Sequence, residues 1–178
     1  MKKDAVTSLY GEQYANAYDD KYLFSTIHRS DTEYELKVLA DLLKGNKSWL
    51  DVACGTGYYL SNFPDHERAG CDISPAMRAK ARQANPSIEI YDHSFLEPNP
   101  EWEGKWDVVS CMWYAYCYVG CMDDVWKVFD HFAQWTAPGG TCFVPYCDLN
   151  LLFRTLLPRH ELDTLDPGRV FLDGCTPE

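Results

Sequence analysis

The chain has 178 residues, of which 46% are hydrophobic and 24% charged, as is typical of one soluble globular domain. Its formal net charge of −11 argues against a nucleic-acid partner, because such a surface repels phosphate backbones. No apolar run is long enough to cross a membrane and no signal segment follows the N-terminal Met-Lys-Lys, so we expect a cytoplasmic protein without a membrane partner.

Residues 1–46 are predicted to form an N-terminal helical cover. Tyr10, Tyr14 and Tyr18 recur every four residues and would share one face of a short helix. The stretch from Ser30 to Glu33 has the form of a capping box, and apolar residues at helical spacing follow it. We therefore expect a second helix, which begins at this box and ends at Gly45.

Residues 47–148 are predicted to alternate strands with helices. Ser74 and Pro75 supply a helix cap and a proline at the first helical position. Such alternation indicates βαβ units and predicts an α/β fold with a Rossmann-like, doubly wound, mostly parallel sheet. The five strands are expected at Trp49–Ala53, Arg68–Asp72, Ile88–Asp92, Asp107–Cys111 and Thr141–Tyr146.

The eight cysteines contain no Cys-x-x-Cys pair, which structural zinc sites usually show. We therefore expect no metal site. Cys54, Cys71, Cys111 and Cys142 lie in or beside predicted strands, where a free thiol behaves as a small buried hydrophobic group.

The stretch from Leu50 to Leu60 reads Leu-Asp-Val-Ala-Cys-Gly-Thr-Gly-Tyr-Tyr-Leu. Gly55 and Gly57 would let the backbone turn sharply from a strand into a helix and lie close to a ligand. Asp72 ends the next apolar run, about where a nucleoside ribose meets a carboxylate. Leu60 stands where a nicotinamide-binding loop has its third glycine, and the Lys of a P-loop is absent, so both of these alternatives are disfavoured.

This stretch resembles the cofactor loop of class I S-adenosylmethionine (SAM) dependent methyltransferases. Together with Cys111-Met112 and the segment Ala137–Gly140, it is similar to natural-product methyltransferases, above all the N,N-dimethyltransferases of deoxyaminosugars. The likeness covers approximately residues 10–146. It implies SAM as cofactor, S-adenosylhomocysteine as product, and a small-molecule methyl acceptor.

By this resemblance, Asp72 would accept hydrogen bonds from the ribose hydroxyls and Asp92 one from the adenine amino group. Tyr18 matches a tyrosine beside the methionine part of SAM, and Tyr10 and Tyr118 match residues near the acceptor amine, which makes these two the expected catalytic residues. The expected cofactor-binding residues are Tyr18, Asp51, Ala53, Cys54, Gly55, Gly57, Asp72, Ile73, Asp92, His93, Ser94, Phe95 and Met112.

The predicted function is SAM-dependent methyl transfer to a nitrogen or oxygen atom of a small molecule. The family's sheet has seven strands, and residues 149–178 offer only a helix-like stretch at Leu149–Leu157 and a possible strand at Arg169–Leu172. We expect this segment to be a partial C-terminal or substrate part. The alternative is a truncated or non-catalytic subunit that binds SAM or S-adenosylhomocysteine. A homo-oligomer or a complementing subunit would then complete the sheet.

Overall fold

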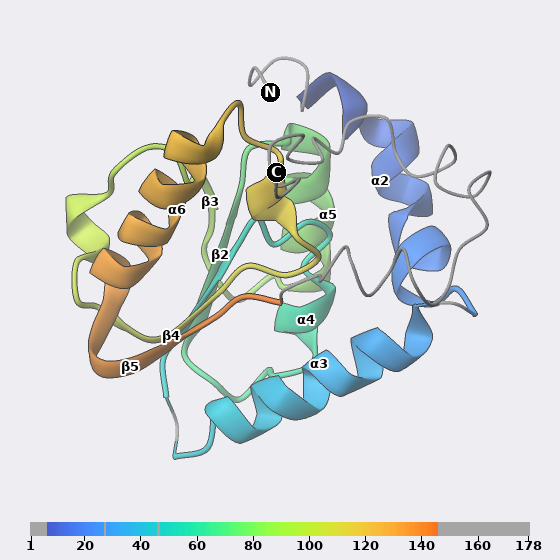
Figure 1. The fold of residues 1–178 in the computed structure, drawn as a ribbon. Helices are drawn as coiled ribbons and strands as arrows, with labels where there is room; N and C mark the ends of the chain where they lie inside the picture. The colour runs from blue at the N-terminus through green and yellow to red at the C-terminus, as the bar shows by residue number, and fades with distance from the viewer. Residues whose placement is uncertain (1–6, 27, 46, 146–178) are drawn as a thin grey trace, which may run out of the picture.

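The computed structural model describes residues 7–26, 28–45 and 47–145. In this part, five parallel strands form one sheet in the order β3-β2-β1-β4-β5 (Figure 1). The predicted parallel α/β fold is thus confirmed, and the strand order reverses between β1 and β4, the kind of point at which such sheets bind ligands. The strands are β1 (Trp49–Val52), β2 (Arg68–Asp72), β3 (Ile90–Asp92), β4 (Trp106–Ser110) and β5 (Thr136–Phe143).

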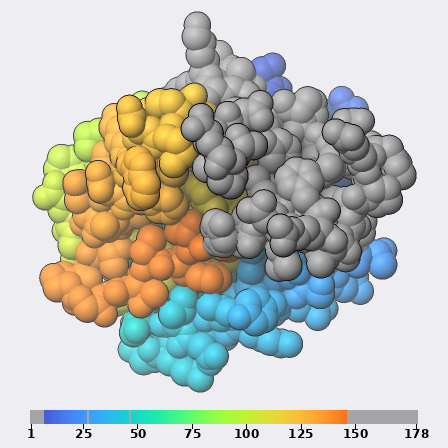
Figure 2. All heavy atoms as spheres, viewed as in Figure 1, coloured from blue at the N-terminus to red at the C-terminus, as the bar shows by residue number. Residues whose placement is uncertain are grey.

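Helices cover both faces of the sheet, with α6 on one side and α3, α4 and α5 on the other (Figure 1). In the space-filling view, α6 lies at the upper left, β5 below it and α3 at the bottom (Figure 2). The helical elements are α2 (Glu12–Tyr18), the π-helix η1 (Asp19–Leu23), α3 (Arg29–Leu42), α4 (Tyr58–Ser61), α5 (Pro75–Ala84), the 3-10 turns η2 (Pro100–Trp102) and η3 (Ala115–Cys117), and α6 (Met122–Trp135).

The core consists of two buried clusters, one on each face of the sheet. Leu50 and Val52 of β1 belong to the cluster that contains Phe132 of α6. Trp49 belongs to the other cluster, together with Leu39 of α3. Because side chains alternate along a strand, the residue between Leu50 and Val52 faces the side of α3. This alternation places the carboxylate of Asp51 inside the protein, among groups contributed by α3 and α4.

The predicted helix start at Ser74 is confirmed, since its hydroxyl oxygen accepts a 3.2 Å hydrogen bond from the N–H of Met77. The predicted capping box at Ser30 is wrong. Helix α3 begins one residue earlier, at Arg29, and its N-cap makes no side-chain hydrogen bond. The hydroxyl of Thr32 instead donates a 3.1 Å bond to the carbonyl of Leu23, a contact with the preceding turn that fixes this helix start.

Further differences concern the outer strands β3 and β5 and the helix that was expected to contain Tyr10, Tyr14 and Tyr18. β5 begins at Thr136 and not at Thr141, because residues from Thr136 onward pair with β4 through a register irregularity. β3 begins at Ile90, two residues later than expected. The rings of Tyr10, Tyr14 and Tyr18 lie next to one another, but the expected single helix is wrong for Tyr10, because α2 begins only after Gly11. The expected segments at Leu149–Leu157 and Arg169–Leu172, and the end of the expected fifth strand, lie outside the described residues.

The thiols divide by position in the sheet. Cys54, Cys71 and Cys111 are free and buried, as predicted. Cys142 is free but exposed, so the prediction of its burial is wrong. It lies on β5, the last strand of the described sheet, where one side of the strand has no neighbour.

Candidate active site

The loop between β1 and α4 requires glycine at two positions. Gly55 and Gly57 have φ angles of +57° and +76°, in the left-handed region that residues with a side chain rarely adopt. A Cβ atom at Gly57 would lie 2.7 Å from Nδ2 of Asn85 and 2.9 Å from Cα of Ala81, so this glycine lets α4 pack on α5. A Cβ atom at Gly55 would have no heavy atom within 4 Å, so the backbone there is open to a ligand.

Asp72, at the end of β2, holds this loop in place. Its Oδ2 accepts a 3.0 Å hydrogen bond from the N–H of Gly55, and its Oδ1 accepts a 2.8 Å bond from the N–H of Ser74. Burial raises the pKa of this carboxyl, although the two hydrogen bonds act in the opposite direction. Each carboxylate oxygen keeps acceptor capacity, which a ligand hydroxyl can use.

Asp51 lies beneath the loop with one oxygen unsatisfied. The hydroxyl of Ser110 donates a 2.6 Å hydrogen bond to Oδ1 of Asp51. Oδ2 is buried and has no partner among the described residues. Burial raises the pKa of Asp51 to about 7, and the charges of Glu35 and Asp72 add to this effect. Because a buried acceptor without a donor is costly, this oxygen favours a ligand that brings a donor or a positive charge.

A single cavity joins the glycine loop, the N-terminal segment and the loop after β4. Its wall contains most of the residues expected from the sequence and brings together groups from all three regions. The expected residues in the wall are Tyr10, Tyr18, Asp51, Ala53, Cys54, Gly55, Asp72, Ile73, His93, Ser94, Phe95, Met112 and Tyr118.

Gly57 and Asp92 are the expected cofactor-binding residues that do not line this cavity. Gly57 is needed for a different reason, because its missing side chain allows α4 to pack on α5. The carboxylate of Asp92 pairs with the guanidinium of Arg78 at 2.9 Å, and its side chain is 59% exposed. A second nitrogen of Arg78 donates a 2.9 Å hydrogen bond to the carbonyl of Asp72, so Arg78 ties the ends of β2 and β3 together.

Several wall residues were missed by sequence reasoning. Thr56 lies between the two glycines, Tyr58 and Tyr59 follow them directly, and Ser74 is the helix cap, so their nearness to the motif was an available signal. Trp113 belongs to the aromatic stretch after β4. The complete set of missed wall residues is Leu23, Thr56, Tyr58, Tyr59, Ser74, Met77, Leu96, Trp113 and Ala115.

The N-terminal segment is held over the cavity by two hydrogen bonds. The hydroxyl of Thr56 donates a 2.6 Å bond to Asp19 of η1, and the hydroxyl of Ser74 donates a 2.7 Å bond to the carbonyl of Tyr10. The ring of Tyr10 meets that of Tyr118 edge-on, with centroids 5.8 Å apart. The structure thus brings together the two residues expected to be catalytic, although 108 positions separate them in the sequence.

Tyr10 remains neutral under ordinary conditions. Burial raises the pKa of Tyr10, and the nearby Tyr118 and Tyr18 raise it further. A neutral phenol donates and accepts hydrogen bonds but is a poor proton acceptor. This cluster is therefore suited to orienting a ligand and not to removing a proton from it.

The four rings after β4 divide between the cavity and the core. Trp113 and Tyr118 line the cavity. Tyr116 packs against Phe129 of α6, with ring centroids 5.4 Å apart. Tyr114 does not line the cavity.

Two further observations concern metal ions and membranes in the described part of the chain. No group of three or more His, Cys, Asp and Glu side chains in it has an arrangement that could hold a metal ion. None of its helices combines the length and the apolar character that crossing a membrane requires.

Known proteins match the chain over the same region. Residues 50–142, more than half of the chain, match the methyltransferase domain family. A dTDP-4-amino-2,3,4,6-tetradeoxy-D-glucose N,N-dimethyltransferase of Saccharopolyspora spinosa is 30% identical over 152 residues, which cover 78% of this chain and 56% of that protein. A dTDP-3-amino-3,4,6-trideoxy-alpha-D-glucopyranose N,N-dimethyltransferase of Streptomyces venezuelae is 28% identical over 142 residues, with coverages of 76% and 58%.

A solved structure agrees with these matches. SAM-bound CalS10, an amino pentose methyltransferase from Micromonospora echinaspora, superposes with a TM-score of 0.58 at 25% identity, covering 64% of this chain and 50% of that one. The chain therefore spans between half and three fifths of the length of these proteins. The family match, the parallel sheet and the cavity at its strand ends show that this chain belongs to the methyltransferase domain family.

Proposed function

We propose that this chain binds SAM in the cavity and transfers its methyl group to the amine nitrogen of a small molecule such as an amino sugar. The observation that carries the proposal is the unsatisfied, buried Oδ2 of Asp51 beside the open backbone of Gly55. SAM presents an ammonium group, a ribose diol and a sulfonium, and Asp51 and Asp72 supply acceptors for the first two. The names of the two related N,N-dimethyltransferases support nitrogen as the acceptor atom.

The end of the cavity next to β2 and β3 is suited to the nucleoside. Asp72 would accept hydrogen bonds from the ribose hydroxyls with its remaining lone pairs. Ile73 and Phe95 would enclose the adenine ring, and the main chain of His93 and Ser94 would complete this pocket. Asp92 lies outside the wall, and its hydrogen bond to the adenine amino group stays a prediction.

The end of the cavity next to β1 and β4 is suited to the methionine part. Asp51 would pair with the ammonium group, and Ala53 and Cys54 would line its path. Tyr18 and Met112 would lie near the sulfur, where an aromatic face attracts a positive charge. When bound, SAM supplies a methyl group on a sulfonium sulfur that leaves as a neutral thioether.

Tyr10 and Tyr118 would orient the acceptor amine so that its lone pair faces the methyl group. The contribution of the protein is then mainly positioning and exclusion of water, which intramolecular analogies place at about 7–11 kcal/mol. A single general base contributes less, typically 10²–10⁴-fold in rate, about 3–5 kcal/mol. A neutral Tyr10 is consistent with this division, because an amine needs orientation more than it needs a strong base.

Two measurements test the proposal. Calorimetry should show that SAM and S-adenosylhomocysteine bind and that NAD does not. Mass spectrometry should then show a gain of one methyl group when the chain and SAM are incubated with free and dTDP-linked amino sugars. Sugars with hydroxyl in place of the amine serve as controls.

Each alternative has its own outcome. Binding of NAD, with no binding of either sulfur nucleoside, would overturn the proposal. Methylation of the hydroxyl controls in preference to the amines would contradict nitrogen as the acceptor. Binding of SAM without transfer to any acceptor would favour the non-catalytic SAM-binding subunit.

A further inference from the structure

The loop after β4 contains a strained turn at the cavity wall. Trp113 and Tyr114 have φ angles of +53° and +58°. Bulky residues rarely adopt this left-handed conformation, which is strained and persists only where the surroundings enforce it. Trp113 lines the cavity, and the turn leads through η3 to Tyr118, which also lines it. The direction of both rings therefore depends on what holds this turn.

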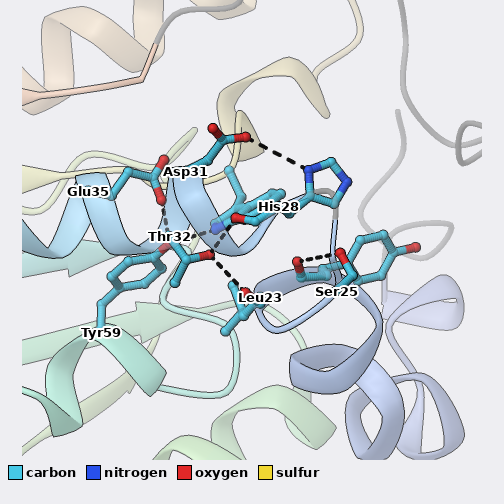
Figure 3. Close-up of polar contacts among 9 residues, drawn as sticks. Leu23, Ser25, His28, Asp31, Thr32, Glu35 and Tyr59 are labelled. Carbon is cyan, nitrogen blue, oxygen red and sulfur yellow. Dashed lines mark hydrogen bonds and ion pairs between the residues drawn. The ribbon is translucent and has the colours of Figure 1, made fainter. Parts of the chain in front are cut away.

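The indole of Trp113 is anchored on its far side by a chain of hydrogen bonds. Its Nε1–H donates a 2.7 Å bond to the hydroxyl oxygen of Tyr59, the second residue of α4. Because an indole N–H can only donate, the Tyr59 oxygen must accept, and its own hydrogen is free to point elsewhere. Tyr59 donates this hydrogen to Oε2 of Glu35, and Figure 3 shows the two side chains directed toward each other.

Glu35 is an unusual residue to find at this point of α3. It is only 8% exposed, and none of the ion pairs between described residues includes it. Burial raises its pKa to about 7, against the opposing effect of the bond from Tyr59. Burying an acid without a cation costs stability, so a role other than stabilising the fold would account for its presence here.

His28, the residue that precedes α3, makes a second contact with the strained turn. The ring of His28 meets the ring of Trp113 edge-on, with centroids 5.1 Å apart. The hydroxyl of Thr32 shares its one hydrogen between the carbonyls of Leu23 and His28, which fixes the approach of this segment (Figure 3). Trp113 is thus held from α3 by a ring contact and, through Tyr59, by a hydrogen-bonded carboxyl group.

We propose that Glu35, acting through Tyr59, is a positioning residue for methyl transfer, which holds the strained turn at Trp113 and Tyr114 and thereby directs Trp113 and Tyr118 at the acceptor. The hydrogen bonds from Trp113 to Tyr59 and from Tyr59 to Glu35 together contribute an amount comparable to the strain of the turn. Tyr59 lines the cavity just beyond the glycine loop, but neither Tyr59 nor Glu35 takes part in the contact of that loop with Asp72. Their loss should therefore affect the acceptor more than the cofactor. The catalytic part of this inference rests on the proposed function.

The anchor itself is tested by NMR on the full chain with ¹⁵N-labelled tryptophan. Trp113→Phe identifies the Trp113 indole signal among the six tryptophans of the sequence. In Tyr59→Phe this N–H loses its acceptor, so its signal should move upfield and exchange faster with solvent. Glu35→Gln keeps a neutral acceptor for Tyr59 and should move the signal in the same direction by a smaller amount.

Two neighbours on α3 provide matched controls. Tyr34 and Glu33 are exposed, so Tyr34→Phe and Glu33→Gln make the same chemical changes and should leave the signal in place. Circular dichroism checks that each variant is folded. If Tyr59→Phe does not fold, the indole signal of Trp113 in Glu35→Gln alone decides whether the anchor exists. An unmoved Trp113 signal in the folded variants would overturn the anchor.

The catalytic part is tested with an amino sugar that the wild-type chain methylates. Tyr59→Phe should lower kcat/KM for this acceptor roughly tenfold to a hundredfold, with the affinity for S-adenosylhomocysteine nearly unchanged. Glu35→Gln should lower kcat/KM several-fold without weakening the binding of S-adenosylhomocysteine, because the charge of Glu35 opposes ionisation of Asp51. A moved indole signal with unchanged acceptor kinetics would overturn the positioning role but leave the proposed function intact. If the wild-type chain methylates nothing, the proposed function fails, and the indole signal decides whether Glu35 and Tyr59 hold the turn.

Discussion

The hydroxyl of Thr56 donates a 2.6 Å hydrogen bond to Asp19, and this contact joins the glycine loop to the N-terminal segment. Thr56 lies between the two glycines with left-handed backbone, so the loop that would meet the cofactor also holds the cover over it. Closure of the segment and occupation of the cavity are therefore expected to stabilise each other.

Replacing Thr56 with Val keeps the shape of the side chain and removes this donor. We expect S-adenosylhomocysteine to bind roughly tenfold more weakly, mainly through faster dissociation, because the cover is held less firmly. Calorimetry and stopped-flow fluorescence measure the two quantities. Thr141→Val on β5 is the matched control. Equal dissociation rates in Thr56→Val and the wild type would show that this bond does not hold the cover.

Asp72→Ala removes the proposed acceptor of the ribose hydroxyls and the partner of the Gly55 and Ser74 amides. Binding of SAM should weaken by roughly 1.5–3 kcal/mol, the range for hydrogen bonds to charged groups. Calorimetry measures the loss, with the exposed Asp130→Asn on α6 as a control. A folded Asp72→Ala variant with wild-type affinity would place the ribose elsewhere.

Phe variants of Tyr10, Tyr118 and Tyr18 should separate the orientation of the acceptor from the binding of the cofactor. Tyr10→Phe and Tyr118→Phe keep the rings that meet edge-on but lose the hydroxyls, so turnover should drop about tenfold to a hundredfold while SAM affinity stays nearly constant. Tyr18→Phe should weaken SAM binding more than it slows turnover at saturating SAM. Steady-state kinetics and calorimetry on the three variants, with Tyr34→Phe as control, test this pattern, and the reverse pattern would contradict it.

The buried acids predict how stability depends on pH. Burial raises the pKa of Glu35 from 4.5, and that of Asp51 from 3.8, to about 7 in each case. At a pH between the ordinary and the raised pKa values, Glu35 and Asp51 retain their protons in the folded chain but have released them in the unfolded chain. The free energy of unfolding of the ligand-free chain should therefore fall as pH rises from about 4 to about 7, and stay lower above that range.

Glu35→Gln removes one of these titrating groups. The variant should lose less stability than the wild type between pH 5 and pH 8, by on the order of 1–3 kcal/mol. Urea unfolding at the two pH values measures this difference, and Glu33→Gln should behave like the wild type. Parallel declines in the wild type and Glu35→Gln would mean that Glu35 does not retain its proton in the fold.

Elements set by short-range interactions followed the sequence pattern, and elements set by long-range contacts did not. The helix start at Ser74 was predictable because cap and proline act within one turn. The start of α3 was not, because a hydrogen bond from Thr32 to the carbonyl of Leu23, nine positions earlier, outweighs the local pattern at Ser30. The start of β5 at Thr136 likewise depends on pairing with β4, which no local pattern reveals.

The sequence by itself determined the glycine loop and the acid at the end of β2, because glycine conformation and strand-end spacing are properties of a short stretch of chain. Only the tertiary structure decided that Asp92 pairs with Arg78 outside the cavity, and that Glu35 supports Trp113 through Tyr59. Glu35 and Tyr59 are 24 positions apart, and Tyr59 and Trp113 are 54 apart. Such contacts depend on how α3, α4 and the loop after β4 pack together, and hydrophobic patterning sets which face is buried without choosing the polar partners within it.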